Sequence, residues 1–134
     1  MASLFAVTCV RSSLHYAASM ALEWEQVIVD SADPVALGRW WAEALGWVVV
    51  GDAPDEFEIR PEKDRMPGLL FVPVPEPKSV KNRLHLDLHA AAGERESEVQ
   101  RLEGLGASVL RHVKEPGGEW AVMTDPEGNE FCVQ

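Results

Sequence analysis

The sequence repeats one order of elements twice, and this duplication restricts the fold more than any other feature. Alternating apolar and polar residues predict strands over 22–30 and 83–90. Apolar residues at helical spacing follow each of these strands. Three landmarks recur at separations of 59, 60 and 60 residues: Gln26 with His85, Gly46 with Gly106, and Gly68 with Gly128. A chain that repeats itself in this way is expected to build two copies of one supersecondary unit.

Each half reads as a strand, a helix and three further strands. Asp33 before Pro34 is a helix start, with Asp33 as N-cap, and Gly46 ends that helix. Strands are then expected over 47–50, 57–61 and 68–74. The second half predicts a helix over 93–106 and strands over 108–112, 119–125 and 129–134. We therefore predict an extension over 1–21 and an α+β domain of two βαβββ modules, module one over 22–75 and module two over 83–134.

The charge and the cysteine content exclude several classes of partner. The chain has 12 basic and 22 acidic residues, which gives a formal net charge of −10. Nucleic acid and anionic membrane surfaces both require a basic face, so neither is expected as a partner. Two cysteines are too few for a disulfide framework, and reduced thiols favour a cytoplasmic protein.

Four short motifs carry a resemblance to a known family. They are the DP pair seven residues after Gln26, ALGW at the end of the first helix, NRLHLDL at the start of module two, and DPEGNEFCV at its end. Together they resemble the vicinal oxygen chelate superfamily, which includes glyoxalases, dihydroxybiphenyl dioxygenases and bleomycin-resistance proteins, and most closely its glyoxalase-like branch. The resemblance implies a homodimer, and a mixed sheet that curls around a cavity between the two modules.

The resemblance also implies where a metal would bind. In this superfamily the ligands come from the first and last strands of each module. The first-strand positions fall at Gln26 and His85, and the last-strand positions at Cys132 and, by the 60-residue offset, at Val72. Valine cannot bind a metal, and a thiol stands where metal-dependent relatives carry a carboxylate. No cofactor is therefore expected; if a divalent metal binds, the expected ligands are Gln26, His85 and Cys132.

The alternation in module two predicts a polar cavity wall. His85 and Asp87 share one strand face, and the opposite face is wholly leucine (Leu84, Leu86 and Leu88), which is expected to pack. We predict that His85 and Asp87 exchange protons as the catalytic residues. Two of the implied ligand positions, Gln26 and Cys132, are also predicted to bind substrate. Glu130, which shares a strand face with Cys132, and the tryptophans Trp24 and Trp120 complete the predicted substrate-binding residues.

Three functions remain open at this point. The first is binding of a small organic molecule, or chemistry on it without a metal centre. The second is a metal-dependent lyase, isomerase or dioxygenase. The third is sequestration of a drug, for which the acidic charge and the tryptophans favour a cationic aromatic ligand.

Overall fold

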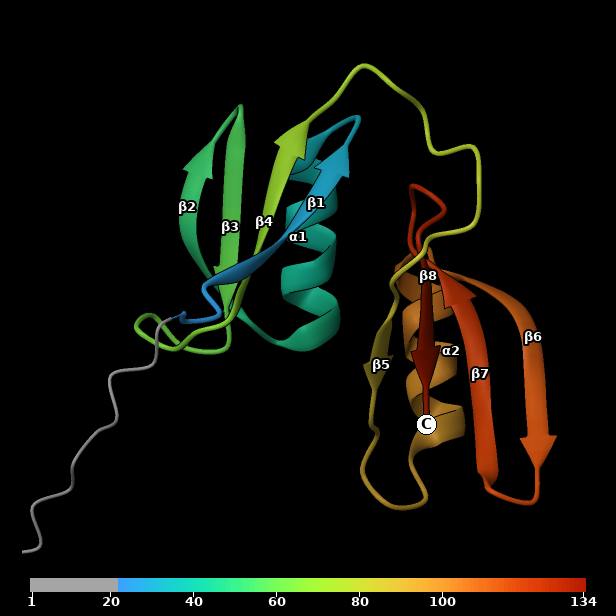
Figure 1. Cartoon of the computed structure of the whole chain (residues 1–134). Coiled ribbons are helices and arrows are strands. Elements are labelled where there is room, and N and C mark those ends of the chain that lie inside the picture. The colour runs from blue at the N-terminus through green and yellow to red at the C-terminus, as the bar shows by residue number, and fades with distance from the viewer. Residues whose placement is uncertain (1–21) are drawn as a thin grey trace, which may run out of the picture.

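The first half of the chain folds into one βαβββ module. A computed structural model describes residues 22–134, and the predicted extension over 1–21 lies outside them (Figure 1). Module one consists of β1 (Gln26–Ser31), α1 (Pro34–Leu45), β2 (Val48–Ala53), β3 (Glu56–Arg60) and β4 (Gly68–Pro73). Its sheet has the order β1-β4-β3-β2, with β1 parallel to β4 and the other pairs antiparallel. The α1 helix covers one face of this sheet and leaves the other open.

The second half repeats this arrangement. Module two consists of β5 (Leu86–Leu88), α2 (Arg95–Leu105), β6 (Ser108–Glu115), β7 (Gly118–Thr124) and β8 (Glu130–Val133). Its sheet has the matching order β5-β8-β7-β6, and α2 covers one of its faces. The predicted α+β fold of two βαβββ modules is confirmed.

The two sheets do not join into the single curled sheet that we expected. Within residues 22–134, β1 pairs only with β4, and β5 pairs only with β8, so each is an edge strand of its own four-stranded sheet. The α1 helix instead packs its two tryptophans against β8 of the other module, through Phe131. No helix among the described residues is long and apolar enough to cross a membrane.

Local sequence signals explain where both helices begin and end. The Asp33 carboxylate accepts a hydrogen bond from the Ala36 backbone N–H at 3.1 Å, which caps α1. Gly46 and Gly106 end the helices with φ values of 66° and 114°, a left-handed conformation that glycine adopts without a steric penalty.

The first strand of each module is shorter than predicted. The pairing of β1 begins with Gln26 opposite Gly68, so 22–25 lie outside the strand, and β5 keeps only the three residues that pair with β8. Leu86 and Leu88 pack on the core as expected, but Leu84 is 85% exposed because it precedes the paired segment. The prediction that Leu84 packs was therefore wrong.

The turn between β7 and β8 fastens module two to module one. Asp125 is buried, and its carboxylate accepts a 3.0 Å hydrogen bond from the indole Nε1 of Trp41. Glu127 accepts hydrogen bonds from the Ser31 hydroxyl at 2.6 Å and from the Ala32 backbone N–H at 2.7 Å. The second contact places a carboxylate just before α1, where the helix dipole favours negative charge. This turn therefore fixes how the two modules sit on each other.

The ends of the two helices are joined by reciprocal hydrogen bonds. Trp40 in α1 donates from Nε1 to the carbonyl of Leu105 at the end of α2, at 3.0 Å. Arg101 in α2 donates from Nη2 to the carbonyl of Ala44 at the end of α1, at 2.8 Å. The last carbonyls of a helix have no partner within it, so each module satisfies an acceptor of the other.

Strand register corrects one equivalence between the halves. Cys132 pairs with Asp87 on one side and Val122 on the other. The residue with the same pairing in module one is Leu70, which lies between Ile28 and Glu58. The offset is thus 59 residues on the first strands and 62 on the last, and the partner of Cys132 is Leu70 rather than Val72. Leucine, like valine, offers no ligand to a metal.

Candidate functional site

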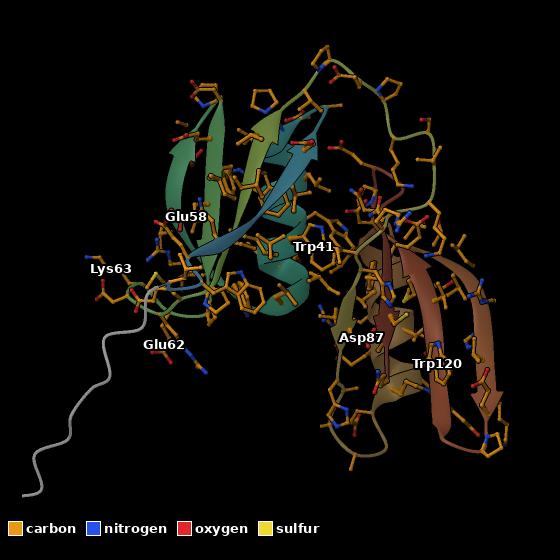
Figure 2. The ribbon with its side chains drawn as sticks, in the orientation of Figure 1. Trp41, Glu58, Glu62, Lys63, Asp87 and Trp120 are labelled. Carbon is orange, nitrogen blue, oxygen red and sulfur yellow. The ribbon has the colours of Figure 1, made fainter. Side chains whose placement is uncertain are left out.

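A pocket of about 560 Å³ lies on the open face of the second sheet, the face that α2 does not cover. Figure 2 shows Asp87 and Trp120 on this module. Its size suits a small organic molecule. It includes most of the residues that the sequence predicts for the site: His85, Asp87, Trp120, Glu130 and Cys132.

The sheet positions these side chains through one row of paired residues. Arg111 of β6 pairs with Val122 of β7, which pairs with Cys132 of β8, which pairs with Asp87 of β5. Paired residues point to the same face, and so do residues two positions along each strand. That period brings His85, Trp120 and Glu130 to the same side as this row. The pocket is thus a direct product of strand alternation.

His85, Asp87 and Cys132 form the polar centre of the pocket. The His85 Nε2 and Asp87 Oδ1 atoms lie 3.4 Å apart, and Gln134 Nε2 donates to Asp87 Oδ2 at 3.3 Å. Burial raises the pKa of the Cys132 thiol, and the negative charge of Asp87 raises it further. The thiol therefore stays protonated near neutral pH and is not an activated nucleophile.

The Glu130 carboxylate is held in place by the segment that joins the modules. It accepts hydrogen bonds from the backbone N–H of Asn82 at 3.1 Å and from Lys78 Nζ at 3.3 Å. Burial opposes its ionisation, but these donors and the Lys78 charge keep its pKa below the ordinary value. Glu130 is therefore an ionised group that anchors this segment beside the pocket.

Two predicted residues lie elsewhere. Trp24 lines a different hollow of about 690 Å³, beside the exposed charged residues of the connection over 62–65. Gln26 begins β1 on the first sheet, and it lines neither hollow. Gln26 and His85 therefore do not line a common hollow within one chain. The hollow with His85 is lined by residues of module two and by Lys81 from the connection before it.

The sequence matches a family model described as "Glyoxalase-like domain" over residues 26–134. The chain belongs to this glyoxalase-like family. The matched range covers both modules, from the first residue of β1 to the end of the chain.

Several solved structures share this glyoxalase-like fold. A glyoxalase/bleomycin resistance protein/dioxygenase family enzyme from Burkholderia phytofirmans PsJN is 16% identical, with a TM-score of 0.70 over 84% of this chain and 97% of that one. TnmS3, an antibiotic binding protein from Streptomyces sp. CB03234, is 23% identical, with a TM-score of 0.63 over 86% and 97%. Lactoylglutathione lyase from Agrobacterium tumefaciens is 16% identical, with a TM-score of 0.60 over 81% and 90%. None of the curated proteins matches the sequence.

Sequence reasoning missed half of the pocket lining. The additional residues are Lys81, Leu110, Arg111, Val122 and Gln134. Val122 and Gln134 lie at even spacing from Trp120 and Cys132, so alternation alone points to them. Leu110 and Arg111 are adjacent, and they reach the same pocket because the β6–β7 register shifts between Val109 and Arg111. Such a bulge sets two residues opposite one and has no reliable sequence signal.

The donor set does not fit the four-ligand metal centre that the superfamily implies. Nitrogen, oxygen and sulfur atoms of His85, Asp87 and Cys132 lie within 4.8 Å of one another. The first-module positions, however, offer only the neutral Gln26, on another sheet, and Leu70. Three donors with one thiol resemble a zinc site more than an octahedral oxygen site.

Proposed function

We propose that this glyoxalase-like protein binds a small organic molecule in the pocket on the open face of the second sheet, without a metal centre. One observation carries the proposal. A pocket of about 560 Å³ combines an apolar wall, which includes Trp120 and Val122, with polar groups that converge from His85, Asp87 and Cys132. If the bound molecule reacts, His85 is the group that moves the proton, and Asp87 orients it.

Binding can be measured directly by titration calorimetry with 2-naphthoate, a rigid aromatic carboxylate. Replacement of Trp120 by alanine is expected to weaken this binding roughly 30-fold, which corresponds to about 2 kcal/mol for a buried aromatic contact. The matched control is Leu84→Ala, which removes an exposed apolar side chain outside the pocket. Equal affinities for wild type and Trp120→Ala would contradict the proposal.

The drug-sequestering function is a special case of this proposal. TnmS3, which shares the fold, is described as an antibiotic binding protein. Binding without turnover would favour sequestration, whereas a bound molecule that is converted in a His85-dependent reaction would make the protein an enzyme. Product analysis of wild type and His85→Ala with each bound compound separates the two.

A metal-dependent lyase, isomerase or dioxygenase is the second candidate, and the clustering of His85, Asp87 and Cys132 is the observation that favours it. Our proposal predicts less than about 0.1 equivalent of transition metal in the purified chain, because the expected ligand set is incomplete. Elemental analysis measures this quantity. A stoichiometric metal that is lost in His85→Ala would replace the proposal with this alternative.

We also propose that the protein is a homodimer in which the open face of module one in one protomer covers the pocket of module two in the other. Both faces are uncovered, and Ile28 on the first face is 57% exposed. The edge strands β1 and β5 each have a free side within residues 22–134. This arrangement would bring Gln26 and Trp24 of one protomer towards His85 of the other.

Light scattering tests the dimer. The expected mass is twice the 14.8 kDa of the chain. Ile28→Arg is expected to dissociate it, because an arginine would be buried without a partner in the interface. Val80→Arg, at a 75% exposed position of the connection between modules, is the matched control. A monomeric wild type would overturn the proposed assembly and leave the pocket as a single-chain site.

A further inference from the structure

Two positively charged side chains at the pocket lack a neutralising partner. Lys81 and Arg111 both line it, and neither has a carboxylate oxygen within 4.0 Å among residues 22–134. Other basic residues near them are paired: Lys78 with Glu130, and Lys114 with Glu119 at 2.8 Å. Lys81 Nζ donates to the backbone carbonyl of Asn82 at 3.4 Å, which does not neutralise its charge. The pocket therefore contains two cations that can bind an external anion.

The acidic groups of the pocket are already engaged. Glu130 is bound by Lys78 and by the backbone of Asn82. Asp87 lies beside His85 at 3.4 Å and accepts from Gln134 at 3.3 Å. A cationic ligand would share these carboxylates with the donors that they already have. An anionic ligand would meet Lys81 and Arg111, which have no carboxylate within 4.0 Å among residues 22–134.

The bulge in β6 gives Arg111 its position. Arg111 lies opposite Val122 at the point where the register shifts, so both Leu110 and Arg111 reach the pocket. Bulges of this kind re-aim side chains and are frequent next to functional sites.

Module one has the same bulge but a different charge pattern. Gly51 occupies the place of Arg111, opposite Glu58. Glu58 in turn is paired with Arg60 at 2.6 Å. The free cation at the bulge is thus specific to the second sheet and is not a general property of the repeated fold.

An apolar surface lies beside the cations. The Trp120 ring, Leu110, which is 55% exposed, and Val122 line the same pocket. A flat ring system would stack or pack on these side chains, and an arginine beside a tryptophan favours planar groups that carry an oxyanion.

We infer that the ligand of this pocket is a flat apolar molecule that carries one oxyanion, with Arg111 and Lys81 binding its charge. The inference rests on the proposed function, because it assumes that the pocket binds a small organic molecule. The net charge of −10 does not oppose it. At physiological ionic strength charges are screened over about 8 Å, so acids elsewhere on the surface act weakly, and the two cations act at contact distance.

Three probes with the same naphthalene ring and similar size, but different charge, test the charge preference. Titration calorimetry of the full chain would use 2-naphthoate, 2-naphthamide and 2-naphthylmethylammonium. The carboxylate is expected to bind at least about tenfold more tightly than the amide, since hydrogen bonds to charged groups are the stronger class. The ammonium probe is expected to bind more weakly than the amide.

Substitutions then identify the groups that bind the charge. Arg111→Gln is expected to remove most of the carboxylate preference, Lys81→Gln part of it, and Arg111→Lys little. Lys114→Gln is the matched control, because it removes the same charge from the same strand at a side chain that is 84% exposed and outside the pocket. Circular dichroism verifies that each variant is folded.

The outcomes distinguish a failure of the oxyanion inference from a failure of the proposed small-molecule binding. Equal binding of carboxylate and amide, or a preference that survives in Arg111→Gln, would overturn the oxyanion assignment and leave the binding pocket intact. Tighter binding of the ammonium probe would reverse the assignment to a cationic ligand. Failure of all three probes to bind would count against the proposed function itself.

Discussion

Replacement of Gly38 by alanine is expected to lower the free energy of unfolding by about 1–3 kcal/mol, although alanine is the better helix former. Gly38 lies in α1, and a Cβ atom added there would be 2.1 Å from Cδ1 of Phe57. Phe57 is completely buried in the core beneath the helix, so its ring cannot move without disturbing its neighbours. Urea unfolding of wild type and variant measures the change.

Gly104 provides the matched control for this prediction. It lies in α2, and an added Cβ atom would meet nothing within 4 Å. Gly104→Ala is therefore expected to raise the free energy of unfolding, by up to about 1 kcal/mol from helix propensity alone. If Gly38→Ala is stabilised as well as Gly104→Ala, then α1 does not pack as closely on the Phe57 ring as described above.

Replacement of Asp125 by alanine is expected to destabilise the protein by roughly 3 kcal/mol, because one buried donor and several half-buried donors lose their acceptor, and a buried donor left without one costs about 1–3 kcal/mol. The donors are the indole N–H of Trp41, the backbone N–H of Glu127, and the backbone and side-chain N–H groups of Asn129, at 2.9–3.2 Å. Thermal or urea unfolding measures the loss. Asp55→Ala, in the exposed turn between β2 and β3, is the control and should change stability little.

A double-mutant cycle isolates the contact between the modules. Trp41→Phe removes the indole N–H but keeps an aromatic ring in the core. Its effect is expected to be smaller in the Asp125→Ala background than in wild type, by about 0.5 kcal/mol or more, as is usual for directly bonded residues. If the effects of the two substitutions on the free energy of unfolding are strictly additive, the turn over 125–129 does not depend on α1 for its stability.

Local signals in the sequence were sufficient to predict every helix and strand of the described region. Alternation, helical spacing and the N-cap at Asp33 depend on only a few neighbouring residues. They therefore predict helices and strands without knowledge of the tertiary packing. The ends of several strands were the exceptions: β1 and β5 are shorter than predicted, and β2 and β6 each extend three residues further than predicted. Strand length there depends on the partner, and Leu84 has none although its alternation with Leu86 is perfect.

Contacts between distant segments were not predictable. The carboxylates of Asp125 and Glu127 bind groups 84 to 96 residues earlier in the chain, and nothing in a turn motif indicates such partners. The equivalence of Cys132 with Leu70 also differs from the 60-residue offset, because the β6–β7 hairpin is longer than the β2–β3 hairpin. The longer connection before β4 compensates for only part of this difference. A constant residue offset between the two modules identifies equivalent residues only where the hairpins and connections that precede them have equal lengths in both modules.

The part of the pocket lining that follows from alternation along single strands was predicted from the sequence. His85, Asp87, Trp120, Glu130 and Cys132 share a face for that reason. Arg111 depends on a bulge, and Lys81 depends on the path of the connection over 74–85, so neither could be found by period alone. These two residues nevertheless set the charge of the ligand that we infer.

A proton–nitrogen correlation NMR titration of the full chain with 2-naphthoate is the most direct test of where the ligand binds. Binding on the open face of the second sheet predicts saturable shifts of the Trp120 indole signal and of the Val122 and Cys132 amides, with the turn at Asp55 unchanged. Shifts confined to the hollow beside Lys63 and Arg65, or no shifts at millimolar probe, would contradict it.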